Sequence, residues 1–177
     1  MYQKTLVGKN LTLRQVSKDD VVFVYANWAS DPEVTKYLTW PAHKSIGVTQ
    51  AIMELWLLKR KDEAARRWMI TLDGKEPIGM IDVVNYDHDK CPEIGYVLGR
   101  RYWHKGYMSE ALGLVLEELF QEGFPYVYAA HDVDNPRSGM VMKHNAMEFV
   151  EKKEKAIKRS DGKMVDILVY RKKNPQI

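Results

Sequence analysis

Cysteine is nearly absent from the chain, because Cys91 is the only one among 177 residues. A single cysteine excludes a disulfide within the chain and is typical of a protein from a reducing compartment. Long apolar runs are missing too: Glu54 interrupts the longest one, at residues 51–58, which is far too short to span a bilayer. The first ten residues are too polar for a signal peptide. We therefore expect a cytoplasmic protein that does not associate with a membrane.

The chain also lacks an excess of charge of one sign. Lys and Arg number 27 and Asp and Glu number 24, which leaves a formal net charge of +3. This balance argues against a nucleic-acid-binding protein, whereas a mildly basic surface suits a small anionic ligand. No internal repeat, low-complexity tract or flexible linker divides the 177 residues. Because that length is ordinary for one domain, we expect residues 1–177 to form a single domain.

Hydrophobic periodicity and turn residues predict a chain that mixes helices with strands. The clearest helix is 107–121, where apolar residues recur at helical spacing and Gly123 follows. Asp31-Pro32 and Asn135-Pro136 each join a capping residue to a proline, which indicates two further helix starts. The polar residues 85–92 predict a loop. The remaining predicted helices are 21–29 and 45–61, and the predicted strands are 11–16, 68–72, 78–84, 93–98, 126–130, 149–157 and 164–171. This order predicts an α/β (α+β) fold around one sheet.

The most informative segment is 99–112, in which a strand leads through a short basic loop into the strong helix. The first amides of a helix have no partners within it, and the helix dipole adds positive potential there, so the loop suits an anion such as a pyrophosphate. Gly106 lets a ligand approach the backbone, and Arg100, Arg101 and Lys105 add positive charge. The alternative is an ordinary strand-to-helix turn whose basic side chains are solvated.

This segment resembles the acyl-coenzyme A binding segment of the GNAT superfamily of N-acetyltransferases, and the resemblance is closest to the ribosomal-protein N-terminal acetyltransferase (RimJ/RimL-like) branch. It extends over nearly the whole chain, through residues 11–20, 28–41, 93–98, 102–112, 134–138 and 143–149. The chain departs from the family pattern at three loop positions: Trp103 replaces Gln or Arg, His104 a frequent glycine, and Met108 a Gly or Ala. At the helix exit, residues 145–147 replace a glycine-phenylalanine pair.

The resemblance implies a single GNAT domain with a mixed, mostly antiparallel central sheet flanked by helices. It implies acetyl-coenzyme A as cosubstrate and no metal, with the coenzyme bound between the strands that begin at Glu93 and Tyr126. Backbone groups of Tyr96, Val97 and Leu98 are expected to pair with the pantetheine arm, much as an added strand does. The other expected coenzyme-binding residues are Trp103, His104, Lys105, Gly106, Tyr107, Met108, Ser109 and Asn135.

Transfer of an acetyl group to an amine requires a neutral amine, a donor for the developing oxyanion and a proton for the departing thiolate. Glu93 is the candidate base. The alternatives are that Glu93 is a solvated strand-end carboxylate, or that a water chain acts as the base in its place. The candidate proton donor is Ser138, whose alternative role is in helix capping, and Tyr107 and Tyr128 are further candidates. Asn135 is expected to cap its helix.

The acceptor amine and the oligomeric state stay open at this point. A lysine amine costs roughly 4.6 kcal/mol to neutralise at pH 7 and an α-amine only about 1.4 kcal/mol, so a weaker base suffices for an α-amine. A protein N-terminus and a small-molecule amine both remain as acceptors. The alternative function is a non-catalytic acyl-coenzyme A-binding or regulatory module with the same fold. The closing hairpin over 149–171 leaves a homodimer open.

Overall fold

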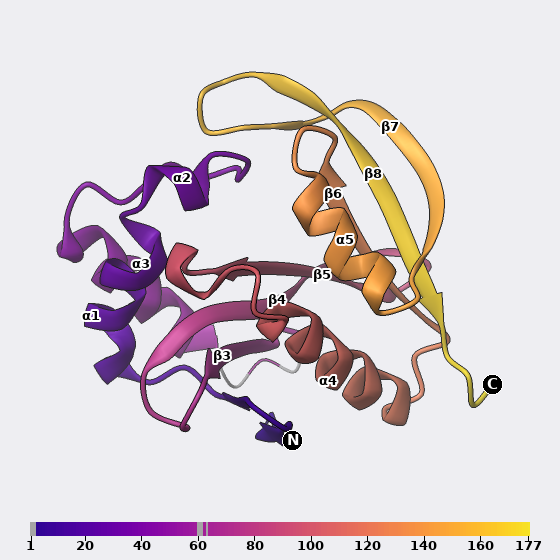
Figure 1. Cartoon of the computed structure of the whole chain (residues 1–177), viewed down its shortest axis with the longest axis horizontal. Helices are drawn as coiled ribbons and strands as arrows, with labels where there is room; N and C mark the ends of the chain where they lie inside the picture. The colour runs from indigo at the N-terminus through magenta and orange to yellow at the C-terminus, as the bar shows by residue number, and fades with distance from the viewer. Residues whose placement is uncertain (1–2, 60–61, 63) are drawn as a thin grey trace.

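The computed structural model describes residues 3–59, 62 and 64–177, and its centre is one sheet with the strand order β1-β2-β3-β4-β5-β6-β8-β7 (Figure 1). Neighbouring strands are antiparallel except β5 and β6, which are parallel. The sheet is therefore mixed and mostly antiparallel, as predicted. The strands are β1 Leu6–Val7, β2 Thr12–Arg14, β3 Arg67–Thr71, β4 Pro77–His88, β5 Cys91–Leu98, β6 Tyr126–Asp132, β7 Glu148–Lys158 and β8 Met164–Lys173.

The parallel pair β5/β6 separates after a short contact. Its register holds only Glu93 opposite Tyr128 and Ile94 opposite Ala129. Beyond Ile94, β5 continues beside β4 as far as Leu98, whereas β6 continues beside β8. The second half of β5 therefore has a backbone edge that no strand of the described sheet covers on its β6 side.

Helices cover both faces of the sheet (Figure 1). On one face, α4 Tyr107–Gln121 and α5 Pro136–His144 pack against a core that includes Ile81 and Ile94. The other face meets α1 Val21–Val24, the π-helical turn Tyr25–Ala29, α2 Pro32–Thr35 and α3 Ile46–Lys59, over a core that includes Met80 and Val97. Because side chains alternate along a strand, neighbouring positions of β4 and β5 supply the two cores. None of the described helices has the length and apolarity that a membrane crossing requires.

Local signals fixed several helix boundaries. α4 has the predicted bounds, and α2 begins at Pro32 with the Asp31 carboxylate accepting a hydrogen bond from the Glu33 amide at 2.9 Å. α3 is described as far as Lys59, so the last two residues of the predicted helix lie outside the described residues. The first predicted strand is shorter than expected, since β2 covers Thr12–Arg14.

The predicted loop over residues 85–92 is wrong. β4 extends to His88 and β5 begins at Cys91, so the two strands form a hairpin with Asp89 and Lys90 as its turn. Both turn residues have positive φ, 51° and 63°, as a turn that matches the twist of the strands requires. Asp89-Lys90 lacks the glycine that usually marks such a turn, so the sequence pattern does not predict the hairpin. This correction matters because the hairpin carries two partners of Glu93.

Candidate active site

A cavity of about 270 Å³ opens where β5 and β6 separate. Its walls come from β4, β5, β6 and the start of α5, and from residues 37–40 between α2 and α3. Ile157 of β7 and Ile167 of β8 also line it. The cavity thus touches the predicted residues Glu93, Tyr96, Val97, Asn135 and Ser138 together.

The β7–β8 hairpin closes the cavity from one side. Its turn reaches across toward α2 (Figure 1), and the Ser160 amide donates to the Leu38 carbonyl at 3.1 Å. The Arg159 guanidinium lies 5.1 Å from the centre of the Tyr37 ring and pairs with Asp132 at 2.7 Å, where both charged side chains are buried. These contacts connect the β7–β8 hairpin to β6 and to the segment after α2, so the hairpin forms a roof over the cavity.

The loop between β5 and α4 leaves backbone donors free. Trp103 bonds through its indole nitrogen to the Leu98 carbonyl at 2.8 Å, which folds the loop back onto the end of β5. His104 and Gly106 have positive φ, 62° and 77°, and α4 begins at Tyr107. Within the described part of the chain, the amides of residues 104–106 have no hydrogen-bond partner. A Cβ added to Gly106 would meet no atom within 4 Å, so the loop is open to solvent at this residue.

The basic side chains of this loop do not all surround that space. Arg100 pairs with Asp31 at 3.0 Å, and Arg101 contacts Glu76 at 3.8 Å, so both arginines connect the loop to the α2 side of the molecule. Lys105 lies 5.8 Å from the Tyr102 ring. The sequence did not suggest Arg137, whose guanidinium lies 5.4 Å from the Trp103 ring and brings a cation from α5 to the loop.

Ser138 and Tyr96 form a hydroxyl pair at the cavity. The Ser138 hydroxyl donates to the Tyr96 oxygen at 3.0 Å, and the Tyr96 hydroxyl donates to the Ser138 carbonyl at 2.8 Å. Burial raises the pKa of the Tyr96 hydroxyl, so this group stays protonated at neutral pH. The sequence assigned Tyr96 only a backbone role and missed its hydroxyl. Asn135 stands at the start of α5 but makes no side-chain capping bond, so the capping prediction is wrong and its side chain is available to the cavity.

Glu93 is held by one carboxylate oxygen. Its Oε2 accepts from the Asn85 side-chain amide at 3.2 Å and lies 2.8 Å from His88 Nε2. The His88 ring stacks on Tyr128 at 4.0 Å, and a register shift between Val83 and Asn85, a β-bulge, brings Asn85 to Glu93. The Glu93 side chain is only 17% exposed, so it is no solvated strand end. Its Oε1 has no bonding partner among the described residues.

Asp82 is a second carboxylate at the cavity, and the sequence analysis missed it. It lies on β4 opposite Gly95, and its Oδ2 accepts from Arg67 Nε at 3.0 Å and from Arg67 Nη2 at 2.7 Å. Burial raises the pKa of the Asp82 carboxyl, while the nearby Arg67 charge acts in the opposite direction. An aspartate in an otherwise apolar strand was the available signal, but its significance depends on the Arg67 partner from β3.

The other predicted residues have mainly structural surroundings. Met108 is buried in the α4 core, so it offers the site only its backbone. The Ser109 carbonyl accepts a hydrogen bond from the Asn145 side chain at 3.0 Å, which joins α4 to α5. Tyr107 packs against the same core as Met108, and Tyr128 stacks on His88, so neither alternative proton donor lines the cavity.

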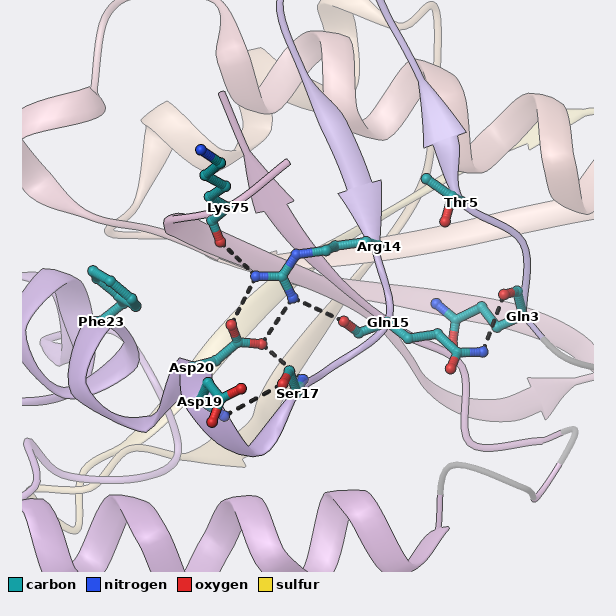
Figure 2. A pocket seen from close by; sticks show the side chains of 9 residues that line it. All are labelled: Gln3, Thr5, Arg14, Gln15, Ser17, Asp19, Asp20, Phe23 and Lys75. Carbon is teal, nitrogen blue, oxygen red and sulfur yellow. Dashed lines mark hydrogen bonds and ion pairs between the residues drawn. The ribbon is translucent and has the colours of Figure 1, made fainter. Parts of the chain in front are cut away.

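A second hollow, of about 700 Å³, lies near β2 and contains the Arg14–Asp20 pair (Figure 2). All five donors of the Arg14 guanidinium are used: two meet the Asp20 carboxylate at 2.9 and 2.7 Å, and the others meet the carbonyls of Gly74, Gln15 and Lys75. Because these groups are satisfied, the pair braces β2 against α1 and leaves no group for a ligand.

Comparison with known proteins decides the family. The family described as "Acetyltransferase (GNAT) domain" matches residues 10–148. The chain belongs to this family. The family prediction and the acyltransferase assignment are thereby confirmed. The chain is also 26% identical, over 174 residues, to the uncharacterized N-acetyltransferase p20 of Bacillus licheniformis, and the match covers 94% of each protein.

Solved GNAT structures share the fold along almost the entire chain. RimL, the ribosomal L7/L12 alpha-N-protein acetyltransferase in complex with coenzyme A, superposes with a TM-score of 0.85 and 20% identity over 96% of this chain and 98% of that one. The Microcin C7 self immunity acetyltransferase MccE, in complex with acetyl-CoA and AMP, gives a TM-score of 0.84 and 21% identity over 94% and 93%. At these identities the likeness shows the fold, which agrees with the resemblance to the RimJ/RimL-like branch.

Proposed function

We propose that this chain transfers the acetyl group of acetyl-coenzyme A to a primary amine. The observation that carries the proposal is the set of free amides before α4, beside open space at Gly106 and next to the uncovered edge of β5. A diphosphate requires several convergent donors, and the start of a long helix supplies them. The complexes of RimL with coenzyme A and of MccE with acetyl-CoA support the same ligand for this fold.

The residues of the chain fit such a ligand from end to end. The amides of residues 104–109 would bind the diphosphate, with Arg137 adding a positive charge beside Trp103. The backbone of Tyr96, Val97 and Leu98 would bind the amides of the pantetheine arm along the edge that β6 leaves uncovered. The Asn135 side chain, which caps nothing, faces the cavity where the thioester would lie.

The cavity also contains a candidate base and a candidate proton donor for the transfer. Acetyl-coenzyme A supplies the thioester carbon, at which a C–N bond forms and the C–S bond breaks. Two protons leave the acceptor ammonium, and Glu93 Oε1 accepts one and passes it to solvent. The departing sulfur takes a proton from the Ser138 hydroxyl, and the second ammonium proton replaces it on the Ser138 oxygen. Tyr96 holds that hydroxyl in position at 3.0 Å. A free Glu93 oxygen in the same cavity as this pair favours catalysis over a module that only binds the coenzyme.

Calorimetry with acetyl-coenzyme A tests the proposal directly. Gly106→Val should abolish binding, because a branched side chain would fill the open space at Gly106 and disfavour the positive φ that sets the path of the loop. Gly74→Val is the matched control, since Gly74 also has positive φ, 81°, and open space but lies in the β3–β4 turn. A bound ligand at about 100 times its Kd should stabilise the native protein and the control by roughly 2.7 kcal/mol. The absence of heat with both acetyl-coenzyme A and coenzyme A would overturn the proposal.

A further inference from the structure

The acceptor side of the cavity contains two carboxylates that each keep one oxygen without a partner. Asp82 uses only Oδ2 to bind Arg67, and Glu93 uses only Oε2 to bind Asn85 and His88. Among the described residues, no hydrogen bond reaches Asp82 Oδ1 or Glu93 Oε1, although both side chains line the cavity. Asp82 is only 7% exposed, but Oδ1 is not fully enclosed, because His131 Nε2 is the one fully buried polar side-chain atom without a partner among the described residues.

The two carboxylates lie on the same face of the sheet, a fixed distance apart. Asp82 is directly opposite Gly95, and Glu93 precedes Gly95 by two residues, so Asp82 and Glu93 are diagonal neighbours. Such neighbours have Cα atoms roughly 7–8 Å apart. Gly95 lies between them without a side chain of its own, and the Val84 side chain packs over it, since a Cβ at Gly95 would lie 2.7 Å from Val84 Cγ1 and 3.6 Å from Asp82 Oδ1.

The rest of the cavity fits an apolar linker rather than an anion. Leu38, Met80 and Ile157 supply aliphatic walls, and no lysine or arginine is found among the described residues that line it. Arg67 and Arg159 lie behind Asp82 and Asp132 and are engaged by them. An acceptor with a carboxylate or phosphate would therefore find no opposite charge inside.

The roof limits the size of the acceptor. The hydrogen bond from Ser160 to Leu38 and the Arg159 contact with Tyr37 connect the β7–β8 hairpin to the far wall. The cavity of about 270 Å³ lies just below the range of about 300–1,000 Å³ that is usual for ligand sites. A small molecule fits this space, whereas an extended peptide would have to displace the roof.

We propose that the acceptor is a small aliphatic diamine, whose reacting amine lies at Glu93 Oε1 and whose second ammonium donates to Asp82 Oδ1. This inference rests on the proposed acetyl transfer and names the acceptor for the same site. A hydrogen bond from an ammonium to a carboxylate is stronger than one between neutral groups, and a chain of a few methylenes spans the distance between diagonal neighbours on a sheet. The transfer itself is unchanged: the C–N bond forms at the nearer amine, and the second amine keeps its protons.

The first test uses the unmodified protein and four acceptors of similar length: butane-1,4-diamine, 4-aminobutan-1-ol, butylamine and 4-aminobutanoate. We expect kcat/KM for the diamine to exceed that for butylamine by about tenfold or more, since a hydrogen bond between charged groups is worth at least that factor. The amino alcohol should lie between them, and 4-aminobutanoate should be the poorest. An amino alcohol equal to the diamine, or a peptide with a free N-terminus that surpasses it, would overturn the inference.

The second test asks whether Asp82 is responsible. Asp82→Asn should reduce the preference for diamine over butylamine to less than about threefold, because the neutral amide no longer favours a cation. Asp20→Asn is the matched control: Asp20 is a buried partner of Arg14 outside the cavity, and its loss should leave the preference unchanged. If Asp82→Asn fails to fold, the acceptor series on the unmodified protein still decides.

A binding measurement separates the two proposals. Calorimetry of butane-1,4-diamine against protein saturated with coenzyme A should show association that 4-aminobutanoate lacks. Acetyl-coenzyme A binding and turnover without a preference for diamine would overturn the acceptor assignment and leave the acetyltransferase function intact. Absence of coenzyme binding would instead overturn the function on which the assignment rests.

Discussion

Ser138→Ala is the substitution that most directly separates catalysis from folding in this protein. The Ser138 side chain makes one hydrogen bond, to the Tyr96 oxygen at 3.0 Å, whereas the Tyr96 hydroxyl donates to the backbone carbonyl of the same residue. Alanine retains that carbonyl, so the Tyr96 anchor survives. We therefore expect a change in the free energy of unfolding of at most about 1 kcal/mol, the ordinary net contribution of one hydrogen bond.

Turnover should respond far more strongly. Loss of a residue that transfers a proton in the transition state typically costs about 10²–10⁴ in rate, which corresponds to roughly 2.7–5.4 kcal/mol of barrier. Because Ser138 acts on the departing sulfur, kcat and kcat/KM should fall together while the Kd for acetyl-coenzyme A stays nearly constant. The rate is measured by release of the coenzyme A thiol under saturating acceptor.

Tyr96→Phe should give the opposite pattern in stability. It removes both hydrogen bonds of the Tyr96 hydroxyl, the one to the Ser138 carbonyl and the one from the Ser138 hydroxyl, so it should cost about 1–3 kcal/mol of unfolding free energy in urea titrations. Ser30→Ala is the matched control for Ser138→Ala, since the Ser30 hydroxyl donates to the Tyr25 carbonyl outside the cavity. The Ser30→Ala protein should turn over at the native rate. An unaltered rate in Ser138→Ala would refute the assignment of Ser138 as proton donor.

Three further predictions concern the groups around this pair. His88→Phe keeps a ring on Tyr128 but removes the hydrogen bond to Glu93, so kcat should fall by about tenfold with no change in the Kd of acetyl-coenzyme A. An unchanged kcat would show that His88 does not position Glu93. Arg159→Met removes the roof contact with Tyr37 and should raise the acceptor KM several-fold while coenzyme binding, followed by calorimetry, stays constant. Burial raises the pKa of Tyr96, so the native protein keeps a proton that the unfolded chain loses above about pH 10. Stability should therefore fall as the pH rises above about 10, and urea unfolding at about pH 9–11 should show a smaller fall in Tyr96→Phe.

The sequence predicts best where a structure depends on neighbouring residues. α4 has the predicted bounds because apolar spacing, a preceding glycine and a following glycine all lie within one segment. α2 and α5 begin at their prolines for the same reason. The β4–β5 hairpin was missed because Asp89 and Lys90 adopt positive φ without a glycine, under the constraint of strand pairing that forms at a distance.

In the candidate site too, the features that depend on neighbouring residues were predicted and those that depend on distant contacts were not. Glu93 and Ser138 were predicted, but the groups that hold them were not: His88 and Asn85 come from the missed hairpin, and the Tyr96 hydroxyl reaches Ser138 across 42 positions of sequence. Asp82 depends on Arg67 of the adjacent strand, which only the strand register brings beside it. Residue identity thus indicated the chemistry, whereas orientation and charge balance follow from tertiary contacts.

The departures from the family pattern acquire a physical explanation in the loop before α4. Met108 is buried in the core, and the Trp103 indole bonds the end of β5, so both side chains serve the fold. The donors proposed for the diphosphate are main-chain amides, and every residue except proline has one. The loop must therefore keep its backbone path, which the positive φ angles of His104 and Gly106 define. Because Gly106 has φ of 77° and open space at its Cβ position, a branched residue there should disturb this path and reach the proposed diphosphate, whereas the departures at residues 103, 104 and 108 leave the main-chain amides in place.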